Sequence, residues 1–426
     1  MGISYYTSKI VRGWKQYGLV AMLRMTKHKM KSRMVLRSNS GDCSIMDLYE
    51  NLLEKYRAGE ICGIAIVPSA FEFDELYNQR TINLAKYLSN NGYGVIYVAW
   101  QWHKNEVLQK NYQHVFKNVI QVPLYGFIET HQKFRIFDEI SDKKYIIMLP
   151  ARVFYDLLFF MKDSGFDIYY DIMDDWQQFH EVGQAPWYIE NIEEAVILNS
   201  NKVTAVSEPL VRKFSYLRQD IELVGNGFYP DVLGEMENIA CNAYAGESGS
   251  NESFNIGYFG HLTDSWFDWD LMFDILEKHE NLNFHVIGYG ESEKIRNKIK
   301  RMPNIKLIGK VSPRELHSYA SSWHAAVIPF IKSELAEAVD PIKIYEYLYF
   351  GLPTVVTGIT HLAGYPFVKV VDNTPEPFYQ AVMGLIESRL RKEYDYAAVR
   401  EFLSDKVWDK RFDDMFKVDF ITSIYK

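Results

Sequence analysis

Cysteine is scarce in this chain, and long apolar runs are absent. The three cysteines, Cys43, Cys62 and Cys241, are scattered and include no C-x-x-C pair. An odd, scattered set argues against a disulfide framework or a structural zinc site, and it fits a reducing compartment. We expect no secretory signal, because the basic start is not followed by an apolar core and a cleavage site. No run reaches the ~18 apolar residues that a membrane-spanning helix needs.

Two nucleotide-binding motifs are also missing. The sequence contains neither a G-x-G-x-x-G fingerprint nor a P-loop, which argues against a dinucleotide cofactor and against ATP hydrolysis of the P-loop kind. What is present is a large apolar fraction: 48% of the 426 residues are hydrophobic and 24% are charged. A chain of this composition is globular, and its length favours about two domains of ~200 residues.

Acidic residues are absent from residues 1–41, which carry nine Lys and Arg. Because the whole chain has a net charge of −8, a basic head precedes an acidic body. Residues 1–58 have a helical pattern in which Trp14 and several Leu and Met interleave with the cations. We expect residues 1–40 to bind an anionic membrane surface; the alternative is a helix packed on its own domain or on a partner protein. Nucleic acid is not expected as a partner, because nothing else in the chain favours it.

From residue 61 the pattern alternates between buried strands and helices. A strand at 61–68, a helix and a second strand at 95–99 form a βαβ unit, which implies a parallel sheet. A Ser-, Gly- and Asn-rich linker then interrupts the alternation, which restarts after it. We therefore predict an α/β protein with two doubly wound, Rossmann-like domains. The predicted segments are a basic helical extension (1–58), a first domain (59–235), the linker (236–253), a second domain (254–400) and a C-terminal helix that returns to the first domain (401–426).

Glycines and charged residues fall where the strands of the second domain end. Ligands of doubly wound sheets bind beyond the carboxyl ends of the strands, and helix N-termini at that edge suit a phosphate. Glu346, on a helix at this edge, could accept two hydrogen bonds from a ribose diol. The alternative is a solvated glutamate, or one paired with Lys343. The other residues at this edge are Gly260, His261, Gly288, Tyr289, Gly290, Gly309, Lys310, Pro329 and Phe330.

Several of these segments together resemble the group 1 (family 4) nucleotide-sugar glycosyltransferases of the GT-B fold. The resemblance rests on P-I-K-I-Y-E-Y-L-Y-F-G-L-P-T-V-V at 341–356, on the strands at 255–260, 284–290 and 305–309 with the helix start that follows, and on residues 205–210 and 225–230. It implies two Rossmann domains facing each other across a cleft, with the nucleotide-sugar donor on the second. It also implies retention of anomeric configuration and no metal or other cofactor. The P-x-K-x-Y-E-Y form is similar to a subgroup that assembles surface polysaccharides.

The resemblance implies specific donor contacts. Glu346 would hold the ribose, and the base would lie near Gly309, Lys310 and Val311. The diphosphate would lie on helix N-termini and Lys343. The remaining implied donor residues are Gly260, His261, Gly288, Tyr289, Gly290, Lys332, Asp340, Pro341 and Ile342.

The sequence departs from the family in the second domain. The family has a second glutamate eight positions before Glu346, where this chain has Ala338; Glu337 and Asp340 lie nearby and could substitute. The family also has Arg and Lys after the first donor strand, where His261 and Trp266 stand. Leaving-group charge must still be stabilised. The candidate cations are Lys343 and Lys332, each of which could instead be a surface lysine.

The first domain departs as well. Asp174 occupies the position at which the family has a histidine facing the donor sugar, and Asp175 follows it. We expect one of the two aspartates to contact the sugar, although adjacent aspartates can also simply hydrogen-bond a turn. Arg80 and His180 are candidates on the acceptor side. Arg80 would hold a phosphate or an acidic acceptor, or would instead form a salt bridge on its helix.

The sequence thus predicts transfer of a sugar from a nucleotide diphosphate sugar to a hydroxyl of a glycan or lipid-linked glycan, in surface-polysaccharide synthesis. The catalytic candidates are Asp174, Asp175 and Lys343. The expected location is cytoplasmic, on the inner face of the membrane. Two alternatives stay open: a non-catalytic GT-B relative that binds a glycan or a partner transferase, and a GT-B nucleotide-sugar epimerase.

Overall fold

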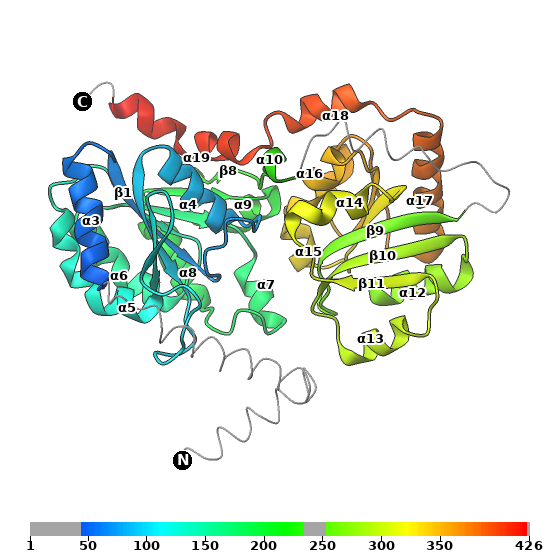
Figure 1. The fold of residues 1–426 in the computed structure, drawn as a ribbon, viewed down its shortest axis with the longest axis horizontal. Coiled ribbons are helices and arrows are strands. Elements are labelled where there is room, and N and C mark those ends of the chain that lie inside the picture. Colours follow the sequence, from blue (N-terminus) through cyan, green and yellow to red (C-terminus); the bar gives the residue numbers. More distant parts are fainter. Residues whose placement is uncertain (1–43, 234–252, 424–426) are drawn as a thin grey trace, which may run out of the picture.

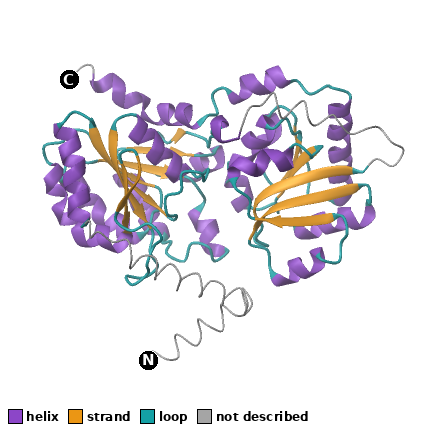
Figure 2. Ribbon diagram, in the orientation of Figure 1, coloured by secondary structure: helices purple, strands orange, loops and turns teal. Residues whose placement is uncertain are grey.

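The computed structural model describes residues 44–233 and 253–423, with side chains described as far as residue 417. This part of the chain forms two lobes, each built on a sheet with helices on both faces (Figures 1 and 2). The basic head at 1–43 and nearly all of the predicted linker at 236–253 lie outside the described residues. No helix in the described ranges is both long and apolar enough to cross a membrane.

The first domain has an eight-stranded sheet in the order β3-β4-β2-β1-β5-β6-β7-β8. Neighbouring strands are parallel except for β3 and β4, which pair antiparallel. The strands are β1 (Gly63–Ser69), β2 (Tyr93–Ala99), β3 (Gln113–Phe116), β4 (Val119–Pro123), β5 (Lys143–Ile147), β6 (Asp167–Ile172), β7 (Lys202–Ala205) and β8 (Glu222–Leu223). The central strands β1 and β2 are buried along their whole length, as expected for a sheet covered by helices on both faces.

Helices connect these strands and cover the sheet. They are α3 (Ile45–Arg57), α4 (Arg80–Asn90), α5 (Leu124–Thr130), α6 (Arg152–Asp163), α7 (Trp176–Glu181), α8 (Glu190–Asn199), α9 (Glu208–Phe214) and α10 (Pro230–Leu233), with a 3-10 helix η1 (His131–Phe137). Helix α3 begins with a capping box on Ser44 and buries Leu48, Tyr49, Leu52 and Leu53 in the first-domain core. The predicted extension at 1–58 is therefore wrong at its end, because residues 45–57 pack as part of the first domain.

The second domain has a six-stranded, fully parallel sheet in the order β11-β10-β9-β12-β13-β14. Its strands are β9 (Phe254–His261), β10 (Leu282–Tyr289), β11 (Ile305–Gly309), β12 (Ala325–Pro329), β13 (Thr354–Thr357) and β14 (Val368–Val370). Its helices are α12 (Trp269–Lys278), α13 (Glu293–Ile299), α14 (Leu316–Ala320), α15 (Glu334–Ala338), α16 (Ile342–Tyr349) and α17 (Pro375–Leu390), with 3-10 helices η2 (Pro313–Glu315) and η3 (Thr360–Gly364). The chain order reverses between β9 and β12, and such a switch point is where doubly wound sheets bind ligands.

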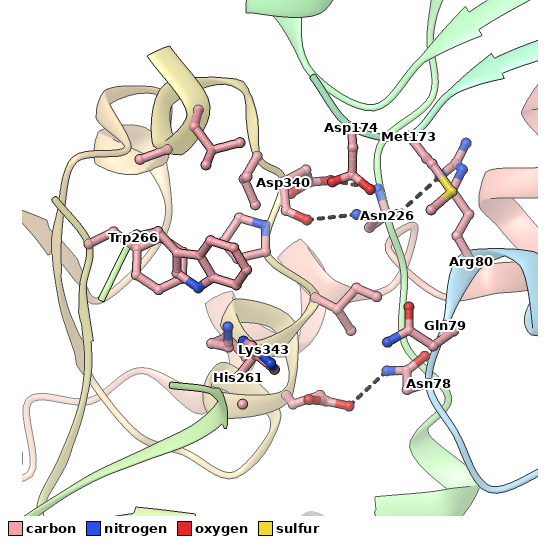
Figure 3. A pocket seen from close by; sticks show the side chains of 18 of the residues that line it. Asn78, Gln79, Arg80, Met173, Asp174, Asn226, His261, Trp266, Asp340 and Lys343 are labelled. Atoms are coloured by element: carbon pink, nitrogen blue, oxygen red, sulfur yellow. Dashed lines mark hydrogen bonds between the residues drawn. The ribbon is translucent and has the colours of Figure 1, made fainter. Parts of the chain in front are cut away.

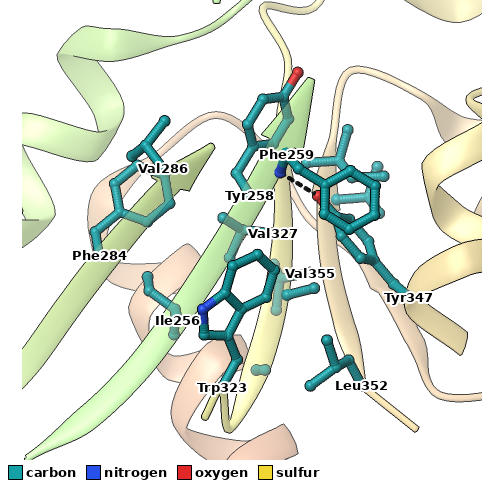
Figure 4. Packing of buried hydrophobic residues seen from close by; sticks show 14 of the residues in the cluster. Ile256, Tyr258, Phe259, Phe284, Val286, Trp323, Val327, Tyr347, Leu352 and Val355 are labelled. Atoms are coloured by element: carbon teal, nitrogen blue, oxygen red, sulfur yellow. Dashed lines mark hydrogen bonds between the residues drawn. The ribbon is translucent and has the colours of Figure 1, made fainter. Parts of the chain in front are cut away.

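Aromatic side chains fill the core of the second domain (Figure 4). Trp323 lies against Gly257, where a Cβ atom would meet the indole at 1.9 Å, so only glycine fits in the middle of this strand. The Tyr347 hydroxyl accepts a hydrogen bond from the Phe259 N–H at 2.9 Å. This bond ties α16 to the end of β9, and so fixes the helix that carries Lys343 and Glu346.

The C-terminal segment crosses back between the lobes. Helix α18 (Tyr396–Leu403) packs on α16 of the second domain, and α19 (Trp408–Ser423) lies along α4 of the first (Figure 1). Trp408, Phe412 and Met415 are buried in a first-domain cluster. Two Rossmann-like α/β domains are present, which confirms the predicted fold class.

Candidate active site between the domains

A cavity of about 370 Å³ lies between the two domains. The second domain contributes the ends of β9 and β12 and the start of α16, whereas the first contributes the segments before α4 and after β6 (Figure 3). Its polar and charged lining residues are Asn78, Gln79, Arg80, Asp174, Asn226, His261, Asp340, Lys343 and Glu346. The cavity thus opens at the switch point of the second sheet.

Lys343 lies in this cavity, half-buried against aromatic rings. Its Nζ is 5.0 Å from the ring centroid of Tyr258 and 5.1 Å from that of Phe330. Gly260, at φ +145°, makes room for it, because a Cβ atom there would approach Lys343 Cε to 2.9 Å. Burial lowers the pKa of Lys343 to about 8, opposed by the charge of Glu346. The ammonium form still predominates at neutral pH, so Lys343 can present a cation to a phosphate.

His261 cannot share that role. Burial and the neighbouring Lys343 charge lower the pKa of its imidazole, which favours the neutral form. The ring packs beside Trp266 and Tyr289, and its buried Nδ1 has no hydrogen-bond partner among the described residues. The family's cation pair after the first donor strand is therefore replaced by a neutral aromatic surface.

Glu346 is 7% exposed, and its Oε1 accepts a hydrogen bond from Asn78 Nδ2 at 2.7 Å (Figure 3). Burial raises the pKa of this carboxyl to about 7, although the Asn78 bond and the Lys343 charge both lower it. The prediction from the sequence is that Glu346 accepts ribose hydroxyls, and its position in the cavity is compatible with that prediction. Asn78 is a partner that the sequence alone gave no reason to select.

The two neighbouring aspartates have different surroundings. Asp174 lines the cavity, and burial raises its pKa to about 7, with a further increase from Asp175 and a decrease from Arg80. Asp175 faces away: it caps α7 by accepting from the Gln178 N–H at 3.0 Å, and it pairs with Lys213 at 2.7 Å. Asp175 was predicted as a catalytic candidate, but these bonds assign it to helix capping.

Arg80 is also held by the protein itself. Its guanidinium is 3% exposed and pairs with the buried Asp171 at 2.6 Å through Nε and at 3.0 Å through Nη2. Its Nη1 donates to the Gly225 carbonyl and to the Asn226 side chain. The prediction that Arg80 binds a phosphate or an acidic acceptor is therefore contradicted, because its donors hold strand β6 and the loop at 225–226 together.

His180 does not reach the cavity either. Its ring contacts the Ala185 carbonyl through Nδ1 at 2.8 Å and packs beside Tyr188. It is absent from the lining of the cavity. The acceptor-side prediction for His180 is thus not supported by its position.

Several predicted donor residues lie outside the cavity wall, although they sit at the same edge of the sheet. The glycines there give space to the protein's own atoms: a Cβ at Gly288 would meet the Gly260 carbonyl, and one at Gly290 would meet the His261 ring. Lys310 Nζ lies 3.9 Å from the ring centroid of Tyr289. The predicted residues outside the wall are Gly288, Tyr289, Gly290, Gly309, Lys310, Val311 and Lys332.

The loop that leads into α16 joins the domains. The Asp340 carboxylate accepts from the Asn226 N–H at 2.5 Å and from the Tyr345 hydroxyl at 2.8 Å. Pro341 and Ile342 follow it in the cavity wall. Ala338 is 3% exposed and packs into the first-domain core, and its carbonyl accepts from Ser207 Oγ at 2.6 Å. A glutamate at this position would bury a charge against the other domain, which gives a physical reason for its absence.

The substitutes suggested for that glutamate therefore differ. Glu337 turns to η3, where it accepts a hydrogen bond from the Thr360 N–H at 2.9 Å, and it does not line the cavity. Asp340 does line the cavity but already serves the two donors described above. Neither residue therefore offers a free carboxylate to a ligand in the cavity.

Comparison with known proteins supports the resemblance stated from the sequence. Residues 254–388 match the family described as glycosyl transferases group 1. TuaH of Bacillus subtilis, named for glycosyl transfer in teichuronic acid biosynthesis, is 22% identical over 180 residues. That match covers 40% of this chain and 44% of TuaH, so it spans less than half of either protein.

Solved structures show the same architecture over most of the chain. A sucrose-phosphate synthase from Thermosynechococcus elongatus has a TM-score of 0.62 at 11% identity, covering 85% of this chain and 100% of its own. Anabaena Alr3699/HepE in complex with UDP and glucose has a TM-score of 0.58 at 10% identity, covering 84% of this chain and 99% of its own. At such low identity the likeness establishes the fold alone. Residues 254–388 thus match the group 1 glycosyl transferases, and the described chain has the GT-B fold.

Proposed function

We propose that this protein transfers a glycosyl group from a nucleotide diphosphate sugar to a hydroxyl of a glycan or lipid-linked glycan. The observation that carries the proposal is that Lys343 and Glu346 both line the interdomain cavity from one helix. That helix belongs to the matched domain. HepE, a protein of the same fold, was solved with UDP and glucose, which supports a nucleotide diphosphate donor for this chain as well.

Three side chains that line the cavity have separate roles. Glu346 accepts hydrogen bonds from the ribose, and Lys343 binds the diphosphate. The bond between the sugar C1 and the phosphate oxygen breaks, a bond from C1 to the acceptor oxygen forms, and the acceptor proton passes to the departing phosphate. Lys343 stabilises the charge that develops on the diphosphate, which is the electrostatic contribution that such a reaction requires. Asp174 contacts the sugar hydroxyls from the other side of the cavity.

The proposal includes retention of anomeric configuration and a reaction without metal or other cofactor, as the resemblance implies. It also includes a role in surface-polysaccharide synthesis, in line with the name of TuaH. We further propose a cytoplasmic enzyme whose basic residues 1–40 hold it on the anionic inner leaflet, close to a lipid-linked acceptor.

A thermal-shift screen with UDP, GDP, dTDP and CMP tests the donor site. A ligand that binds only the folded state raises the unfolding midpoint. We expect one nucleotide to stabilise the wild type and to lose most of that effect in Glu346→Ala and Lys343→Met. Glu376→Ala, at an exposed position on α17 of the same domain, is the matched control and should respond like the wild type.

Turnover separates an enzyme from a binding protein. Release of the nucleotide from the corresponding sugar donor should require Lys343, and added chelator should leave the rate unchanged. If no nucleotide stabilises the wild type at millimolar concentration, the donor-site proposal is overturned. The neutral His261 in place of a cation pair would then favour the non-catalytic GT-B protein.

A further inference from the structure

Asn78 joins the two domains at the carboxylate assigned to the ribose. It lies just before α4 of the first domain, yet its Nδ2 donates to Glu346 Oε1 on α16 of the second at 2.7 Å (Figure 3). Oε2 of Glu346 has no hydrogen-bond donor among the described residues. One oxygen of the carboxylate is therefore engaged across the cavity, and the other is available to a ligand.

The Asn78 side chain is fixed in one orientation. Its Oδ1 accepts from Asn83 Nδ2 at 2.8 Å and from Trp408 Nε1 at 2.6 Å. The Trp408 indole N–H can only donate, so the oxygen of the Asn78 amide must face it and the NH₂ must face Glu346. Trp408 is fully buried and stacks on Phe412 of the same helix. The C-terminal helix α19 thus contacts the amide that bonds Glu346.

We propose that Asn78 is a positioning residue for the nucleotide: held by Asn83 and Trp408, it orients the Glu346 carboxylate so that its free oxygen accepts a ribose hydroxyl when the domains are together. This inference rests on the proposed function. It adds that the ribose contact depends on the first domain and on α19, although both lie outside the matched family domain.

The charges around Glu346 determine what removal of Asn78 does. Lys343 precedes it on the same helix, His261 shares the cavity, and Glu75 and Lys86 of the first domain line a small neighbouring hollow. Burial raises the pKa of Glu346, and the Asn78 bond opposes that increase. Without the bond, Glu346 holds its proton to higher pH. Nucleotide binding needs the ionised carboxylate, so affinity falls when the pH drops below the Glu346 pKa. In the variant this loss should begin at a higher pH than in the wild type.

The test measures affinity for the nucleotide found in the screen between about pH 5.5 and 8.5. Asn78→Asp keeps the side-chain volume but replaces the donor with an acceptor, and Asn78→Ala removes the amide. Both should weaken binding about tenfold at pH 7, the effect of one charge-assisted hydrogen bond. Both should also move the pH midpoint of binding upward. Trp408→Phe should shift the midpoint in the same direction by less.

Phe416→Leu is the matched control on α19, because Phe416 is also buried but packs on Tyr87 and Tyr169 rather than on Trp408. It should lower the unfolding midpoint and leave the pH profile of binding unchanged. If the Asn78 variants bind the nucleotide with wild-type affinity and pH midpoint, the inference is overturned while the proposed function stands. If the wild type binds no nucleotide, both fall.

Discussion

Arg80 was a candidate ligand contact by its place in the sequence, but in the structure it forms a buried ion pair with Asp171. Its expected contribution is therefore to stability. Asp171 is fully buried, and it also accepts from Thr204 Oγ1 at 2.7 Å. Arg80→Met would leave this carboxylate without its counter-charge. Loss of one partner of a buried ion pair costs about 3–5 kcal/mol, so we expect the free energy of unfolding in urea to fall by that amount.

The exposed pair of Arg212 and Glu208 on α9 provides the control. Arg212→Met should lower the free energy of unfolding by less than about 1 kcal/mol, because exposed pairs contribute little. An Arg80 variant with wild-type stability but weakened substrate binding would restore Arg80 as a ligand residue.

Glu193 is a second buried ionisable side chain. It is 1% exposed, accepts from the Tyr170 hydroxyl at 2.5 Å through Oε1, and leaves Oε2 without a partner among the described side chains. Burial raises its pKa from 4.5 to about 7. Between those two pH values the folded state keeps a proton that the unfolded state has lost, so stability falls as the pH rises from 4.5 to about 7 and is level above that.

Glu193→Gln should therefore reduce this decline. We expect the unfolding midpoint of the wild type to fall more steeply between about pH 4.5 and 7 than that of the variant. Glu194→Gln, one position along α8, should keep the wild-type slope. Parallel curves for the wild type and Glu193→Gln would show that Glu193 is already ionised in the folded protein.

At the element scale, α19 acts as a covering helix for the first domain. Phe412 is fully buried between Trp408 and Tyr87 of α4. Truncation of such an aromatic costs about 3–5 kcal/mol through lost burial and the cavity left behind. Phe412→Ala should lower the free energy of unfolding in urea by this amount. Lys410→Ala, on the exposed face of the same helix, should change it by less than about 0.5 kcal/mol.

The whole molecule depends on contacts between its two domains. Asp340 bonds the backbone of Asn226 in the first domain, and Gly225 beside it leaves room for the carboxylate, since a Cβ there would lie 2.8 Å from Asp340 Oδ2. Asp340→Ala should therefore favour a more open arrangement. We expect a larger radius of gyration in small-angle X-ray scattering with unchanged circular dichroism.

Asp372→Ala, an exposed position in the loop after β14, is the control and should scatter like the wild type. If Asp340→Ala keeps the wild-type radius of gyration, the remaining contacts suffice to hold the domains. Those contacts include the Ser207 bond to Ala338 and the packing of α15 on α7 and α9.

The sequence by itself determined the two Rossmann-like domains, because alternating buried strands and amphipathic helices are local patterns. It also placed Lys343 and Glu346 at the cavity edge, because a helix that follows a strand of a parallel sheet begins at that edge. Only the tertiary structure decided which polar groups have partners. Arg80 and Asp171 lie far apart in the sequence, as do Asn78, Trp408 and Glu346, and no local pattern records such pairs. Whether a charged side chain binds a ligand or the protein itself depends on these long-range contacts, since burial and hydrogen bonding are set by residues from both domains.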